Sequence, residues 1–99
     1  MKVKTANLID RALDYAVALA LNPTELPNIA YLADYSQDIA LANDLIETYG
    51  IVVRQREADW IATMQISVEC GPTREIAVAQ CFAVSRLGEF VEIPDELLF

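Results

Sequence analysis

The run over residues 59–69 most constrains the fold of this chain, because apolar side chains recur there at every second position. A period of two is typical of a strand with one buried and one exposed face. Glycine and proline follow directly, so the strand should end there. We therefore predict one long central strand whose buried face consists of Trp60, Ala62, Met64, Ile66, Val68 and Cys70.

The next segment, Gly71, Pro72 and Thr73, predicts a turn that leads into a helix over residues 74–87. Thr73 can accept a hydrogen bond from the free amides at the helix start, and Gly88 suits the position just after the helix end. This helix has little polar surface, which predicts that it is buried on more than one side.

Two further helices are predicted over residues 6–20 and 37–49, where apolar residues recur every three to four positions. Thr5 and Ser36 are the expected N-caps, and Gly50 should end the second helix. The remaining expected elements are a loop over residues 22–35, short strands at 2–4, 51–56 and 90–93, and a helical turn after Pro94.

Together these elements predict an α+β fold with a small antiparallel sheet, in one domain over residues 1–99. The helices carry more apolar surface than one side of a small sheet can bury. We therefore expect helices packed on both faces of the sheet, which is an α/β/α sandwich.

The overall charge restricts the function classes. Fifteen acidic and seven basic residues give the 99-residue chain a net charge of −8, which repels phosphate backbones, so direct nucleic-acid binding is not expected. The same charge would attract a partner with a basic surface, or it only keeps the chain in solution. Because 55% of the residues are apolar, we also expect surface for a partner or for a homo-oligomer.

Signals for secretion, membrane insertion and cofactors are missing from the sequence. It has no secretory signal and no apolar stretch long enough to span a bilayer, so we expect a cytoplasmic protein that does not associate with a membrane. Cys70 and Cys81 are interpreted as reduced core thiols. Asp10 and Asp14 share one helix face but are interpreted as solvated side chains, so we expect no metal and no cofactor.

Catalysis is not expected either, because the chain has no histidine, no glycine-rich phosphate loop and no nucleophile with an identifiable base. A candidate anion site is the helix start at Gly71, Thr73 and Arg74, where free amides, a hydroxyl and a guanidinium can meet. The alternative is an ordinary capped turn whose arginine pairs with a carboxylate.

Candidate partner-binding residues are of two kinds. Tyr35 and Trp60 can offer flat stacking surfaces, although core packing is the favoured role of Trp60. Glu89, Glu92 and Asp95 place acidic groups near the C-terminus, where they can face a basic partner.

Five segments carry a resemblance to known proteins: residues 1–5 with the helix that follows, 35–39, 60–62, 71–73 and 81–82. In order and spacing they resemble the NinX-like phage proteins and the related phage ABA-sandwich domain. The resemblance covers nearly the whole chain. It implies a phage or prophage origin and a sheet packed between helices, and it implies no known activity.

Two function classes follow. The first is a non-enzymatic protein-interaction module that acts on a host protein, for example as an antagonist of host defence. The alternative is a protein that binds or sequesters a small, nucleotide-like anion.

Overall fold

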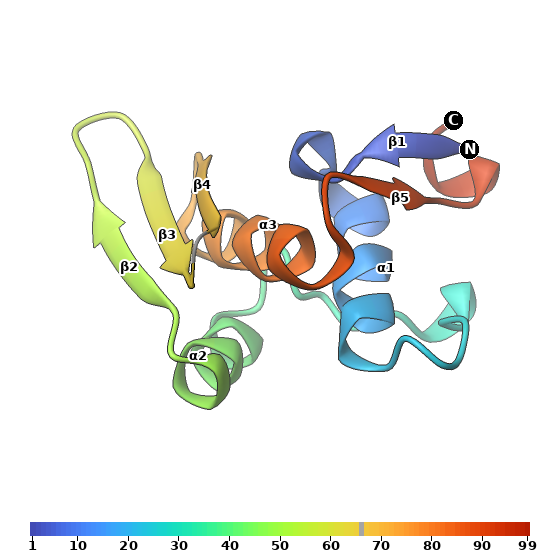
Figure 1. Cartoon of the computed structure of the whole chain (residues 1–99), viewed down its shortest axis with the longest axis horizontal. Helices are drawn as coiled ribbons and strands as arrows, with labels where there is room; N and C mark the ends of the chain where they lie inside the picture. Colours follow the sequence, from blue (N-terminus) through green and yellow to red (C-terminus); the bar gives the residue numbers. More distant parts are fainter. Residues whose placement is uncertain (66) are drawn as a thin grey trace.

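In the computed structural model, which describes residues 1–65 and 67–99, the strands form two antiparallel sheets (Figure 1). The α+β class is therefore confirmed, and so are helices packed against a sheet. The three-stranded sheet has the order β2 (Val52–Gln55), β3 (Trp60–Met64), β4 (Ser67–Gly71), and β1 (Lys2–Lys4) pairs with β5 (Phe90–Glu92). The helices are α1 (Asp10–Leu21), α2 (Ile39–Tyr49) and α3 (Arg74–Leu87), with short 3-10 turns at Thr5–Asn7, Ile29–Tyr31 and Asp95–Leu97.

The prediction of one long strand over residues 59–69 is wrong, because β3 and β4 are the two arms of a hairpin. Met64 pairs with Ser67, so these two residues point to the same side of the sheet. The inward-facing positions therefore change from even numbers in β3 to odd numbers in β4. Val68 and Cys70 lie on the exposed face and not in the core, while Ile66 is outside the described residues.

Helix α3 lies at the centre of the molecule. It contacts β3 and β4 on one side, α1 on another side, and also α2 (Figure 1). The seven consecutive residues 77–83 are all buried, which confirms that α3 is covered on more than one side. Strand β4 approaches α3 so closely that a Cβ atom at Gly71 would lie 2.8 Å from the Ala77 nitrogen.

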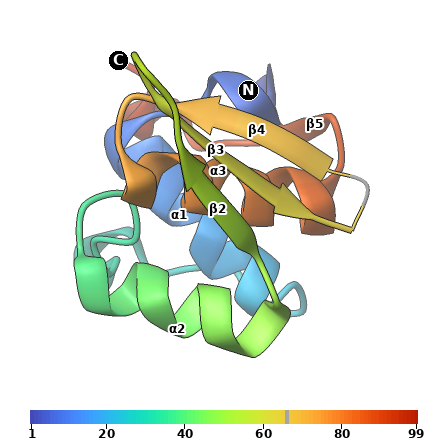
Figure 2. The same ribbon diagram turned by 90° about the vertical axis from the view of Figure 1, so that its left-hand side faces the viewer.

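The helices cover one face of the three-stranded sheet, which differs from the expected cover on both faces. Figure 2 shows the other face of β2, β3 and β4 turned to the viewer, with no described segment in front of it. The layers follow in the order sheet, α3, α1. Helix α3 can lie in the middle because it is apolar almost all round, so it packs against the sheet on one side and against α1 on the other. One face of the sheet is thereby left uncovered.

The helix ends are set by local capping. Thr73 caps α3 as predicted, with its Oγ1 accepting from the Ile76 N–H at 3.2 Å. The cap of α2 is Asp38, whose carboxylate accepts from two backbone amides, and not Ser36. Thr5 begins a 3-10 turn, so α1 starts later than predicted, at Asp10. None of the helices described is both long and apolar enough to cross a membrane.

Candidate functional site

The uncovered side of the three-stranded sheet, which we call the outer sheet face, consists of two rows of side chains. The pairing of the strands places Val52, Thr63 and Val68 in one row. The second row, two residues further along each strand, is Arg54, Ile61 and Cys70. Val52 is 61% exposed and Val68 is 51% exposed, so apolar side chains on two strands are open to solvent. Large apolar side chains that share one exposed face are typical of a binding surface.

Arg54 is the only charged residue among these six positions. Near one end of the face, the Arg56 guanidinium makes two 2.7 Å bonds to the Asp59 carboxylate and lies 3.2 Å from the Cys70 sulfur. The bonded guanidinium lowers the pKa of Asp59. The charges of Arg56 and Asp59 neutralise each other. The outer sheet face therefore combines an apolar surface with one uncompensated cation, Arg54.

Strands β2 and β4 are the two edges of this sheet, since each is paired with β3 on one side. Exposed edge strands carry backbone donors and acceptors that another chain can pair with, and charged side chains on them discourage such pairing. Edge strand β2 contains Arg54, whereas β4 exposes Val68 and Cys70. Because β4 also carries a charged residue, Glu69, each edge has a side chain that discourages pairing with another chain.

The predicted anion-site residues come together at the start of α3, but each has a structural partner. Gly71 is buried against α3, and the Thr73 hydroxyl oxygen accepts from Ile76. Arg74 Nη2 donates to Asn43 Oδ1 at 2.7 Å, which joins α3 to α2. The arrangement matches a capped turn whose arginine bonds to a neighbouring helix, although the bond is to an amide and not to a carboxylate.

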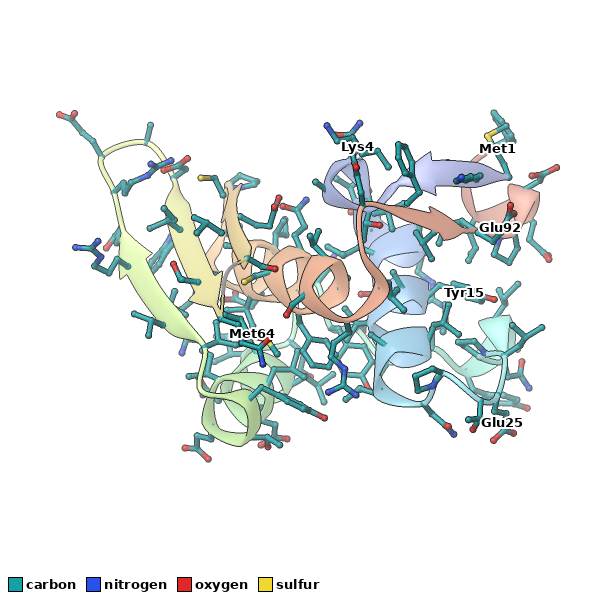
Figure 3. All side chains as sticks on the ribbon, viewed as in Figure 1. Met1, Lys4, Tyr15, Glu25, Met64 and Glu92 are labelled. Atoms are coloured by element: carbon teal, nitrogen blue, oxygen red, sulfur yellow. The ribbon has the colours of Figure 1, made fainter. Side chains whose placement is uncertain are left out.

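The predicted partner-binding residues do not form one surface. Trp60 is half-buried on the inner face of the sheet and packs against the core, while Tyr35 lies in the loop before α2. Glu92 and Asp95 lie 3.2 and 3.3 Å from the N-terminal amine. Figure 3 shows Glu92 and Met1 together at one end of the molecule, away from Met64. Glu89 is exposed but lies elsewhere, because its backbone oxygen accepts from the Thr5 N–H, next to Lys4, whose charge acts on Glu69 of β4.

Asp14 is a buried carboxylate that we expected to be solvated, so this prediction is wrong. Its Oδ1 accepts from the Ser36 N–H at 2.8 Å, and burial raises its pKa. Arg11, one turn earlier, donates to the backbone oxygens of Ile29 and Leu32. The two side chains fasten residues 22–38, which we call the α1–α2 loop, to α1. The available signal was the position of Asp14 inside a continuous apolar stretch, Ala12 to Val17.

The two cysteines have different environments. Cys81 is fully buried in α3, and burial together with nearby Glu69 raises the pKa of its thiol to about 11. This confirms the interpretation of Cys81 as a core thiol. Cys70 is exposed, so the same interpretation is wrong for Cys70 because the hairpin turns it outward.

Within residues 1–65 and 67–99, no three His, Cys, Asp or Glu side chains are grouped closely enough to hold a metal ion. Comparison with protein-family models finds none that matches this chain, and a search of curated proteins finds no match either.

Proposed function

We propose that the chain is a non-enzymatic protein-interaction module that docks its partner on the outer sheet face. The observation that carries this proposal is the uncovered row of Val52, Thr63 and Val68 on adjacent strands. Burying apolar surface contributes about 25 cal/mol per Å², so a partner that covers these side chains gains directly from contact.

The net charge adds to the proposal. A chain of charge −8 is attracted over long distances by a basic partner, which speeds the encounter. The resemblance to NinX-like phage proteins makes a host protein the expected partner, with the cytoplasm of the host cell as the place of contact. Long-range attraction and short-range apolar contact then use different parts of the molecule.

A pair of charge-matched variants tests the proposal. Val68→Lys places a cation on the outer sheet face, and Ile9→Lys places one on α1's N-terminal side, where Ile9 is 60% exposed. We expect wild type and Ile9→Lys to capture the same host protein, and Val68→Lys to lose it while keeping its thermal stability. Capture by all three would contradict the outer sheet face as the docking surface.

The partner on the outer sheet face can also be a second copy of the chain, and the same variants distinguish this case from binding of a host protein. If sedimentation shows a wild-type dimer that Val68→Lys makes monomeric, the partner is a second copy. Binding of a nucleotide-like anion has no comparable support, because Thr73 and Arg74 already bond within the chain. An anion-dependent thermal shift that Arg74→Ala abolishes would favour that alternative.

A further inference from the structure

A second candidate site, independent of the outer sheet face, is a cleft between α1 and α2. Both helices pack on α3 but hardly on each other, which leaves a cleft of about 200 Å³. One face of α2 forms a wall through Leu41, Asp44, Leu45 and Thr48. The other lining residues are Leu21 at the end of α1, Tyr35 in the α1–α2 loop and Tyr49 at the end of α2.

The residues that line the cleft favour one kind of ligand. Leucine side chains and tyrosine rings make most of its lining, and Asp44 supplies the only charged side chain among the lining residues. No basic residue lines it, although the Arg86 guanidinium lies 5.4 Å from the centre of the Tyr49 ring. An apolar cleft with one carboxylate favours a ligand that is cationic at one end and apolar at the other.

The tyrosine wall is held in place before any ligand binds. The residue after Tyr35 donates its N–H to the buried Asp14 carboxylate, and the Asp38 N–H donates to the Asp34 oxygen at 2.8 Å. Because the residues on both sides of Tyr35 are anchored in this way, ligand binding loses little conformational entropy in ordering the loop. The cleft is also smaller than the roughly 300–1,000 Å³ of drug-sized sites, so it suits a short ligand.

We propose that this cleft binds an ammonium group carried on a short apolar stem. The stem lies between Leu21, Leu41 and Leu45, and the ammonium lies beside the Asp44 carboxylate at the rim. Free alkylamines and the lysine side chain of another protein share this chemistry.

The test is an NMR titration of the full chain with three probes of equal length: butylammonium, 1-butanol and butyrate. We expect shifts at Tyr35, Leu41 and Leu45, with butylammonium binding more tightly than butanol and butyrate binding least. Shifts equal for all three probes, or no shift at these residues, would overturn the proposal.

Two variants in α2 show whether butylammonium binds because of the Asp44 carboxylate or only because the whole chain is acidic. Asp44→Asn and Glu47→Gln each remove one negative charge from an exposed side chain, but only Asp44 lines the cleft. Asp44→Asn should weaken butylammonium binding by up to about fivefold, as for an exposed ion pair, and leave butanol binding unchanged. Equal weakening by both variants would overturn the proposal, because only the net charge would then matter.

A lysine derivative with both backbone termini blocked distinguishes the two sources. Tighter binding of this derivative than of butylammonium would assign the cleft to a partner's lysine. Weaker binding would assign it to free amines.

Discussion

Asp14 holds the α1–α2 loop on α1 by one buried hydrogen bond to the Ser36 backbone. A buried N–H without an acceptor costs about 1–3 kcal/mol, because water cannot replace the lost partner. This bond, together with those of Arg11, holds Tyr35 and the start of α2 in place relative to α1.

Replacing Asp14 tests this role through the free energy of unfolding. Asp14→Ala removes the acceptor for Ser36 and should lower this free energy by about 1–3 kcal/mol. Asp14→Asn keeps an acceptor oxygen and should stay close to wild type. Equal losses in both variants, measured by urea denaturation, would mean that the charge matters and the acceptor does not.

The raised pKa of Asp14 also predicts a pH dependence. Because burial raises the pKa of this group, the folded state keeps the proton at pH values where the unfolded state has lost it. The contribution of Asp14 to the free energy of unfolding should therefore fall as the pH rises from about 3.9 through its raised folded pKa, and then level off. Glu69 contributes in the same direction, since burial raises its pKa as well.

Asp14→Asn should flatten part of this decline, and the portion that Glu69 contributes should remain. The measurement is a set of denaturation midpoints between pH 3.5 and pH 7. A profile identical to that of wild type would show that Asp14 titrates at the same pH in both states.

At the scale of elements, the hairpin of β3 and β4 determines which side chains reach solvent. It places Cys70 on the outer sheet face, while Cys81 stays in the centre of α3. Under native conditions Cys70 should react rapidly with a thiol reagent. Cys81 should react only as fast as the chain unfolds, because it is fully buried and its thiol is hard to ionise.

Mass spectrometry of the labelled protein checks this prediction. One rapid and one slow modification is the expected result. Two slow modifications would support the single long strand that the period-two pattern suggested.

The sequence predicts elements whose signals are local and misses those that depend on distant partners. Residues 74–87 and 37–49 were predicted within about two residues, because Thr73, Gly50 and Gly88 mark helix ends by local capping. The hairpin was missed because Gln65 takes a left-handed φ of 54° at a position without the usual glycine or asparagine. The outer sheet face follows from that turn, and the burial of Asp14 depends on Ser36, 22 residues away.

At the scale of the whole molecule, the acidic side chains of Glu92 and Asp95 lie apart from the outer sheet face. Glu92 and Asp95 lie by the N-terminal amine, and Figure 3 shows Met1 and Glu92 at one end of the molecule, away from Met64. Such remote charges act on a partner through long-range attraction, which salt largely screens beyond about 8 Å at physiological ionic strength.

Charge reversal at this end should change how fast a basic partner associates. Glu92→Lys combined with Asp95→Lys should slow association and flatten its dependence on salt, while dissociation changes little. Surface plasmon resonance at several salt concentrations measures both rates. A large rise in the dissociation rate would instead place these residues inside the contact surface.

The most direct test of the outer sheet face is methyl NMR of the chain bound to its partner. The account predicts that the methyl signals of Val52, Ile61 and Val68 shift most, because these side chains become buried. The methyls of Ile9 and Ile39, which are exposed elsewhere, should keep their positions. Unchanged signals on β2, β3 and β4, with shifts centred on residues 89–96, would contradict the account.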